Sequence, residues 1–292
     1  MSDDGGSTGI LRDELGVLPP GDIRQCLVAL GNNPNARDLF NYRFCDGSFN
    51  GHAVGNIILS ALELQTGSFA EAVKIVADFM QITGEVIPVS LEKHDLMMKD
   101  GADIIKGEFA ISQHKIVNRN ARVYLSPNAK INPDAAKAIS NADIIVIAPG
   151  NLFGSLLPAL SVDGIKTAMK NKKAKVVMIA NLVNKPTQTM GWHVVDYINE
   201  MELYIGNRID YVLYNNRLPS KELLNKYAED DELPLLIDMP TFKKHKTIFI
   251  GAPLVASNTH KQDPADKSIK RTLIRHDAKE TVNQLRKLII NS

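Results

Sequence analysis

The chain has little cysteine, no long apolar run and almost no net charge. Its two cysteines, Cys26 and Cys45, are too few for a disulfide framework or a structural zinc site. No apolar stretch reaches the ~18 residues of a transmembrane helix, so we expect no membrane span. The net charge of +1 gives no reason to expect nucleic acid or an anionic membrane as the main partner. The N-terminus is acidic and glycine-rich rather than basic and then apolar, so we expect a cytoplasmic protein.

Several motifs of well-known enzymes are also missing. The sequence has no His-Glu-x-x-His, no paired Cys-x-x-Cys, no Gly-x-Ser-x-Gly and no Walker loop. Residues 90–93 fit Ser-x-x-Lys, but neither companion motif of the β-lactamases accompanies them. Because no nucleophile can be paired with a general base, the sequence disfavours a covalent hydrolase.

Short apolar runs that end in turn residues form the strongest pattern in the chain. They occupy residues 144–147, 176–179 and 211–214, and each is followed by a segment with helical periodicity. Continuous apolar runs are typical of strands buried on both faces, and their alternation with helices is typical of βαβ units. The sequence therefore predicts a single α/β domain over residues 1–292, with a mostly parallel sheet flanked by helices.

Glycines and capping residues mark the ends of several predicted helices. Helices are expected at 22–31 and at 55–66, and Gly67 ends the second of them. Ser68 and Glu71 form a capping-box pair, which indicates that another helix begins there.

Two segments depart from the alternation of strand and helix. Residues 83–125 contain short alternating runs around the turn at 100–101, which predict a small antiparallel β insertion. Residues 256–272 are polar and rich in Lys, Asp, Asn and Thr, and we expect a mobile loop there. A last strand and a final helix are expected after this loop, and the capping pair Asp277 and Glu280 begins the helix.

The first candidate for a ligand site is the glycine-rich segment 2–9. Its glycines let successive backbone N–H groups converge on an anion, and Ser7 and Thr8 add hydroxyl donors. The adjacent carboxylates of Asp3 and Asp4 can hold a ribose hydroxyl, a base edge or a divalent cation. The alternative interpretation is a frayed, solvated chain end.

The second candidate is the turn at 149–155, which follows a predicted buried strand and precedes a helix. In open α/β sheets, ligands bind beyond the carboxyl ends of the strands, where helix N-termini offer unpaired N–H groups. The segment matches neither the dinucleotide fingerprint nor the P-loop, so a plain strand–helix connection is the alternative.

Three further segments carry single candidate residues. In the glycine-rich segment 51–56, His52 is either a general base or phosphate donor or, more commonly, a hydrogen-bonded structural residue. In 19–24, Asp22 is first of all an N-cap, and Arg24 as a phosphate clamp is the less favoured hypothesis. Arg275 stands at the predicted end of the last strand, where it binds a phosphate or forms a structural ion pair.

Taken together, these segments resemble the YvcK/CofD superfamily. Each segment is unspecific alone, but the ordered set runs through nearly the whole chain. Within the superfamily, residues 18–30 and 274–277 resemble the gluconeogenesis-factor (YvcK) branch. The segments that carry the resemblance are residues 2–9, 18–30, 51–56, 148–158, 181–182, 214–216 and 274–277.

The resemblance implies a Rossmann-like fold that binds a nucleotide. In the YvcK branch the expected ligand is a nucleotide sugar such as UDP-N-acetylglucosamine, and the expected role is regulation of gluconeogenic growth, cell shape and cell-wall synthesis. A binding protein without turnover is then the favoured hypothesis, with no cofactor and no metal. The expected partner is the nucleotide sugar, and further copies of the chain and cell-wall synthesis proteins are open alternatives.

The CofD branch implies a different activity. Its members transfer a phospholactyl group from a guanosine diphosphate carrier to a deazaflavin, with a metal such as Mg near the acidic pair. A structural remnant that has lost binding is a third hypothesis, because family members begin with a strand and a Gly-Gly-Gly-Thr-Gly type loop. Here Met1 stands where the family's second strand ends, so we expect one β-loop-α unit and its phosphate contacts to be missing.

The resemblance also implies ligand-binding positions. The glycine-rich start forms one wall, the turn after the first apolar run meets the phosphates, and polar residues at later strand ends complete the site. The positions are Asp3, Asp4, Gly5, Gly6, Ser7, Thr8, Gly150, Asn151, Leu152, Phe153, Ser155, Asn181, Asn216, Tyr227 and Arg275.

Overall fold

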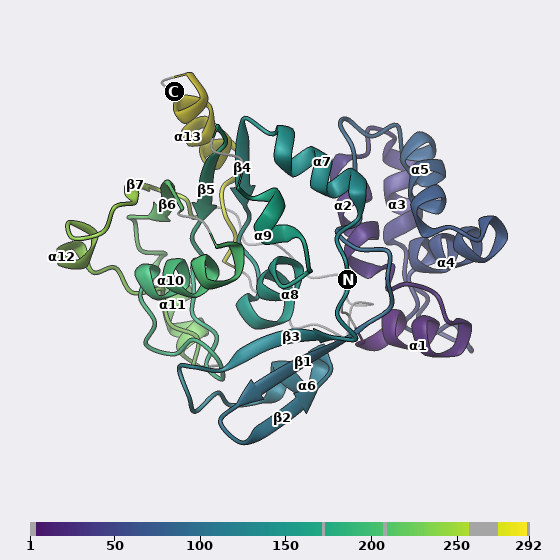
Figure 1. The fold of residues 1–292 in the computed structure, drawn as a ribbon, viewed down its shortest axis with the longest axis horizontal. Helices are drawn as coiled ribbons and strands as arrows, with labels where there is room; N and C mark the ends of the chain where they lie inside the picture. The colour runs from purple at the N-terminus through teal and green to yellow at the C-terminus, as the bar shows by residue number, and fades with distance from the viewer. Residues whose placement is uncertain (1–3, 171–172, 207–208, 230, 257–273, 291–292) are drawn as a thin grey trace.

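In the computed structural model of the chain, residues 4–170, 173–206, 209–229, 231–256 and 274–290 are described. They form a block of helices, a small antiparallel sheet and a parallel sheet flanked by helices (Figure 1). This arrangement confirms the α/β class that the sequence predicts. None of the helices in these ranges combines the length and apolar content that a bilayer span requires.

The helices of residues 6–80 pack around a core of their own, at one end of the molecule in Figure 1. Leu27, Leu59 and Val76 lie at its centre, because apolar residues recur three and four positions apart along each helix. The helices predicted at 22–31 and 55–66 are found there. The block consists of α1 (Gly6–Leu15), α2 (Gly21–Leu30), α3 (Pro34–Asn41), α4 (Val54–Thr66) and α5 (Phe69–Met80).

The predicted antiparallel insertion is present as a three-stranded sheet in the order β2-β1-β3. The buried carboxylate of Asp100 ends its first strand and accepts hydrogen bonds from the backbone N–H groups of Val117 and Asn118 and from the ring of His114. Burial alone would raise the pKa of Asp100, but these hydrogen bonds lower it overall. The elements are β1 (Asp95–Asp100), β2 (Asp103–Lys106), α6 (Glu108–Gln113) and β3 (Arg122–Ser126).

The parallel sheet has the order β4-β5-β6-β7, and all three of its pairings are parallel. The strands predicted at 144–147, 176–179 and 211–214 are therefore confirmed. The expected burial on both faces is not found for the first of them, because it lies at the edge of the sheet, where Val146 is 41% exposed. The fourth strand, β7, was not identified in the sequence. The strands are β4 (Ile144–Ile147), β5 (Lys175–Ile179), β6 (Tyr211–Asn215) and β7 (Ile248–Ala252).

Two different cores cover the two faces of this sheet. Met178 and Val212 face the main core, which the helices that follow the strands complete. Val177 and Leu213 point to the opposite face, where Leu285 packs against them. The helices after β3 are α7 (Pro133–Asn141), η1 (Leu152–Leu156, a π-helical turn), α8 (Leu157–Leu160), α9 (Ile165–Ala168), α10 (Val194–Ile205), α11 (Lys221–Ala228), α12 (Met239–Phe242) and α13 (Ala278–Ile290).

Two expectations about the end of the chain have different outcomes. Of the expected last strand, the described residues form an isolated bridge between Val255 and His276, whereas Asp277 does cap α13 by accepting a hydrogen bond from the N–H of Glu280. The predicted loop at 256–272 lies outside the described residues except for Ala256. The organisation of the chain as a single domain stays a prediction.

The start of α5 provides a test of the predicted helix cap. The Ser68 hydroxyl accepts a hydrogen bond from the N–H of Glu71, which otherwise has no partner in the helix. We expect Ser68→Ala to lower the free energy of unfolding by about 1 kcal/mol. Ser68→Asp should stay close to the parent in stability, because its carboxylate also caps the helix. Urea unfolding of the two variants beside the parent checks this, and an alanine variant as stable as the parent would contradict it.

Candidate functional site

A cavity of about 750 Å³ lies beyond the carboxyl ends of β4 and β5. This is the edge of a parallel sheet at which ligands bind in open α/β folds, and the volume is typical of a small-molecule site. Side chains from the strand ends, the helical block and the chain's last described segment surround it. The cavity is lined by Gln25, Pro149, Gly150, Asn151, Leu152, Asn181, Leu182, Val183, Asn184, Lys185, Gln188, Thr189, Tyr197, Glu232, Ile274, Arg275 and His276.

Asn181 and Gly150 join the two strand ends beneath the cavity. The Asn181 side-chain Nδ2 donates to the Gly150 carbonyl oxygen at 2.8 Å, and the Gly150 N–H donates to Asn181 Oδ1 at 3.3 Å. Both ends of the amide are thus used to hold the turn after β4. The sequence predicts Asn181 as a ligand contact, and the structure places it on the cavity as the residue that positions this turn.

The turn after β4 leads directly into a helix that starts at the cavity. Asn151 caps η1 because its Oδ1 accepts from the N–H of Gly154 at 3.1 Å. The helix continues into α8, so its first turn directs backbone N–H groups and the positive end of its dipole toward the cavity. Leu152 lines the cavity, whereas Phe153 is buried against Trp192 with ring centroids 6.1 Å apart. Ser155 is exposed and does not line the cavity.

A short strap at residues 274–276 carries Arg275 to the cavity. The Ile274 N–H donates to the Tyr227 hydroxyl, and the Arg275 carbonyl accepts from Ala256 at 2.8 Å. On the far side, His276 Nε2 lies 3.0 Å from the Ala180 carbonyl oxygen. Among the described residues, no hydrogen bond or ion pair engages the Arg275 guanidinium. Tyr227, predicted as a ligand contact, is buried and supports the strap instead.

Another part of the cavity wall is a turn at 185–189, which contains none of the predicted site residues. The Lys185 N–H and the Tyr197 hydroxyl both donate to Thr189 Oγ1, each at 2.9 Å. Burial raises the pKa of Tyr197 to about 12, so its hydroxyl stays protonated at neutral pH. The only signal for this wall in the sequence is its position after the strand that ends at Ile179.

The glycine-rich start does not line this cavity. Gly6, Ser7 and Thr8 form the first turn of α1, and the two hydroxyl residues are buried there, while Gly5 stands at the N-cap. Asp4 Oδ1 accepts a hydrogen bond from the Phe109 N–H at 2.9 Å, and Asp3 lies outside the described residues.

At the other end of the sheet edge, Asn216 extends the β6–β7 ladder through its N–H, which donates to the Ala252 carbonyl, and does not line the cavity. Within the described ranges, no three His, Cys, Asp or Glu side chains gather in an arrangement that would hold a metal ion.

Three of the sequence segments instead meet in a buried polar network. Ser7 Oγ lies 3.1 Å from His52 Nδ1 and accepts from Asn56 Nδ2 at 3.2 Å. Asn56 Oδ1 accepts from Arg24 Nε at 3.0 Å, and Arg24 Nη1 donates to Asn41 Oδ1, also at 3.0 Å. The network joins α1, α2 and α4. His52 thus has a hydrogen-bonded partner, as its structural alternative expects, and Arg24 is held by Asn56 and Asn41. The N-cap expected at Asp22 is wrong, because α2 begins at Gly21 and Pro20 occupies its N-cap position.

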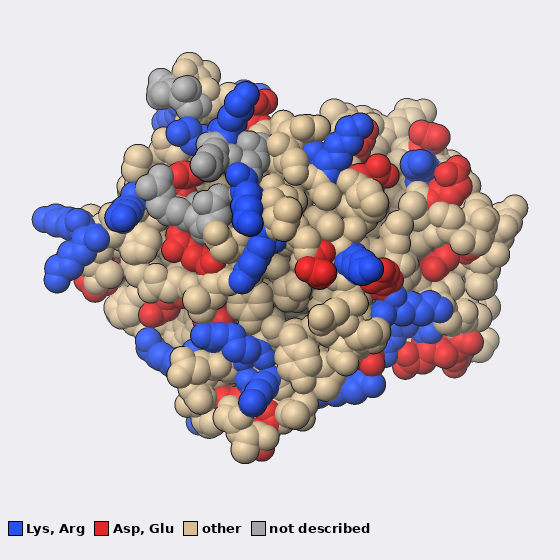
Figure 2. All heavy atoms as spheres, viewed as in Figure 1, with Lys and Arg blue, Asp and Glu red and all other residues tan. Residues whose placement is uncertain are grey.

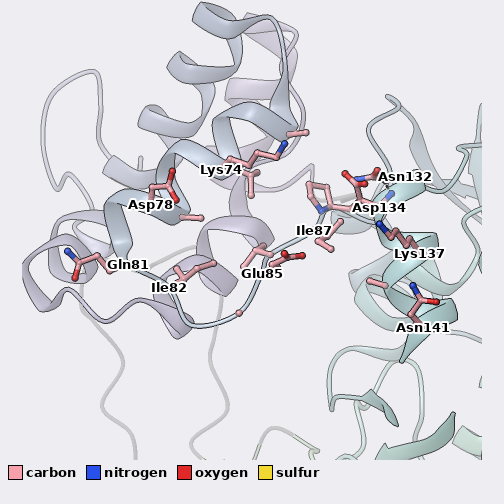
Figure 3. Close-up of a pocket in the computed structure, with 17 residues that line it drawn as sticks. Lys74, Asp78, Gln81, Ile82, Glu85, Ile87, Asn132, Asp134, Lys137 and Asn141 are labelled. Atoms are coloured by element: carbon pink, nitrogen blue, oxygen red, sulfur yellow. Dashed lines mark hydrogen bonds between the residues drawn. The ribbon is translucent and has the colours of Figure 1, made fainter. Parts of the chain in front are cut away.

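A second cavity, of about 760 Å³, lies between α5 and α7 (Figure 3). Lys74 and Asp78 extend from α5, Asp134 and Lys137 from α7, and Glu85 lies on the segment between the helices. Carboxylates and lysines are mixed along it, and it contains none of the predicted site residues. We therefore place the candidate site at the carboxyl edge of the parallel sheet.

The face drawn in Figure 2 shows Lys and Arg side chains interspersed with Asp and Glu among larger areas of uncharged residues, in agreement with the net charge of +1. Lys243, Lys244 and Lys246, which follow α12, are exposed, as expected for a solvated basic run.

Comparison with known proteins assigns the family. The sequence model of the family described as 2-phospho-L-lactate transferase CofD matches residues 1–255. The chain belongs to this family. Its similarity to curated gluconeogenesis factors agrees with the branch that the motifs indicate.

Two curated relatives and one solved structure show how far the similarity extends. The gluconeogenesis factor of Listeria monocytogenes is 40% identical over 79% of this chain and 72% of its own length. The gluconeogenesis factor of Bacillus subtilis is 34% identical over 98% of this chain and 87% of its own. The crystal structure of protein BH3568 from Bacillus halodurans superposes with a TM-score of 0.87 at 32% identity, covering 98% of this chain and 89% of that one.

The buried network gives a second testable prediction. Asn56→Ala removes the partner of Arg24 Nε and of the Ser7 hydroxyl, both of which are buried. We expect it to lower the free energy of unfolding by about 2–3 kcal/mol, because a buried charged donor loses a hydrogen bond. Urea unfolding measures this loss, with the exposed Asn141→Ala as the matched control. A loss no larger than that of the control would show that the network does not stabilise the helical block.

The strap gives a prediction about pH. Burial lowers the pKa of His276 below 6.5, although the hydrogen bond to the Ala180 carbonyl acts in the opposite direction. The fold thus prefers the neutral ring, so its contribution is complete above pH 6.5 and is lost as the pH falls through the lowered pKa. His276→Gln keeps a donor for Ala180 but does not titrate. As the pH falls from neutral to acidic, the free energy of unfolding should decrease more steeply for the parent than for His276→Gln. Equal slopes for the two proteins would contradict this.

Proposed function

We propose that the chain binds a nucleotide sugar of the UDP-N-acetylglucosamine type in the cavity beyond β4 and β5. It acts in the cytoplasm as a regulatory factor without turnover, in the control of gluconeogenic growth, cell shape and cell-wall synthesis. The observation that carries the proposal is the convergence of the Gly150–Leu152 turn and Arg275 on one cavity.

The cavity offers two kinds of donor for a diphosphate. The first is the backbone at the start of η1, where N–H groups and the helix dipole favour an anion. The second is the guanidinium of Arg275, whose planar fork matches phosphate oxygens. Asn181 and the 274–276 strap hold these donors in place before any ligand arrives, which lowers the entropy that binding must offset.

The names of the relatives support the regulatory part of the proposal. The curated relatives from Listeria monocytogenes and Bacillus subtilis are gluconeogenesis factors, and neither name states a reaction. The chain's own sequence pairs no nucleophile with a general base, which agrees with binding rather than turnover.

Calorimetry with UDP-N-acetylglucosamine, UDP and uridine tests the proposal. We expect the parent to bind the two diphosphates and Arg275→Ala to weaken both by about tenfold or more, because hydrogen bonds to a charged group contribute roughly 1.5–3 kcal/mol. Binding of uridine should change little. The exposed Arg286→Ala, on α13, is the matched control and should bind like the parent.

Two outcomes would contradict the proposal. If the parent bound neither diphosphate, or if Arg275→Ala bound them as tightly, the cavity would not hold the ligand's phosphates. If the chain transferred a phospholactyl group from a guanosine diphosphate carrier to a deazaflavin in the presence of magnesium, and Asp4→Asn abolished the product, the CofD-type reaction would replace regulation without turnover.

A further inference from the structure

Lys185 is the second cation on the cavity, and its backbone is rigidly placed. Its N–H donates to Thr189 Oγ1 at 2.9 Å, and its carbonyl accepts from the N–H groups of Gln188 at 3.0 Å and Thr189 at 2.8 Å. The side chain is half-buried in the cavity wall. A lysine in this setting loses part of its hydration, so its charge has to be balanced locally.

Two glutamates provide that balance. Burial lowers the pKa of Lys185, whereas Glu108, at the start of α6, and Glu232, beyond α11, act in the opposite direction and favour the charged form of the lysine. Glu232 lines the cavity directly. Glu108 lies beside η1 rather than on the cavity, and its Oε1 is 3.1 Å from the position that a Cβ on Gly154 would take. One carboxylate thus stands on the cavity wall, and a second stands beside the helix that starts at the cavity.

Four of the five amide side chains around the cavity already form hydrogen bonds within the protein, and the fifth, Gln25, is exposed on the helical block. Asn181 holds Gly150, and Asn151 Oδ1 caps η1. Asn184 donates to the Trp192 carbonyl and accepts from Tyr197, and Gln188 donates to the Ile111 carbonyl. Selection of a ligand by these amides would require their internal hydrogen bonds to break, so the charged side chains are left as the main basis for discrimination.

We propose that Lys185 determines the charge specificity of the cavity by neutralising Glu232 and Glu108, so that a nucleoside diphosphate enters while Arg275 and the η1 turn bind its phosphates. The inference rests on the proposed function and assigns a residue that acts on the ligand through its neighbours. Without the Lys185 charge, both carboxylates would repel a diphosphate across a partly desolvated wall, where charge interactions are stronger than in water.

This role differs measurably from direct contact between Lys185 and the ligand. If Lys185 neutralises the carboxylates, removing a carboxylate compensates for removing the lysine. If Lys185 binds a phosphate itself, removing Glu232 does not restore the lost contact. A double-mutant cycle separates the two cases.

The experiment is calorimetry with UDP and uridine on the full chain and four variants. We expect Lys185→Gln to weaken UDP binding by about tenfold and Lys185→Arg to keep it close to the parent, because arginine retains the charge. Glu232→Gln alone should strengthen UDP binding, and Lys185→Gln with Glu232→Gln should regain most of the loss. Uridine binding should stay unchanged in all variants, and the exposed Lys244→Gln is the matched control.

Each other result has a definite meaning. A double variant that binds UDP as poorly as Lys185→Gln overturns the neutralising role, and so does a Lys185→Gln variant that binds like the parent. Equal losses for UDP and uridine would show a structural defect rather than charge selection, which also overturns the inference. If Lys185→Gln does not fold, Glu232→Gln still decides, since unchanged or weaker UDP binding contradicts the inference. If the parent binds UDP but the variants do not show the expected changes in affinity, only this inference is refuted. If the parent binds no diphosphate, the proposed function is refuted.

Discussion

The parallel pairing of β4 with β5 is the constraint on which the rest of the site depends. It places Ile147 beside Met178, so the two chain segments that leave the sheet emerge next to each other. Only at that spacing can the Asn181 amide bind both the N–H and the carbonyl of Gly150. These two hydrogen bonds fix the turn after β4 and so direct the start of η1 at the cavity. Ile147 and Met178 face the same core, and a register shift of one residue would turn one of them to the opposite face and would separate Asn181 from Gly150.

The cavity combines a rigid neutral frame with a few charged groups. Its amides hold backbone turns, and its tyrosine stays protonated because burial raises the pKa of Tyr197 to about 12. The strap that carries Arg275 is fixed on both sides by hydrogen bonds to other segments. Such preorganisation lowers the cost of binding, because the donors need little rearrangement when an anion arrives.

In the helical block, residues of the family's sequence motifs bind one another. Ser7, Arg24 and Asn56 come from three of the segments that carry the resemblance to the family, and in this structure their side chains form one hydrogen-bonded network. Arg24 is 4% exposed, and a guanidinium so deeply buried has to be satisfied by fixed acceptors. The segments thereby tie three helices together, and the block contributes only Gln25 to the cavity.

The sequence by itself determined the elements whose causes are local. The run 176–179 is apolar on both sides of the chain, which is typical of a buried strand, and the hydroxyl of Ser68 and the carboxylate of Asp277 cap helices within three residues of themselves. Tertiary structure alone decided that Gly150, Lys185 and Arg275 share a cavity and that Tyr227 supports the strap from behind. Burial, hydrogen-bond partners and pKa depend on residues that are distant in the chain, and the sequence pattern around each residue carries no information about those neighbours.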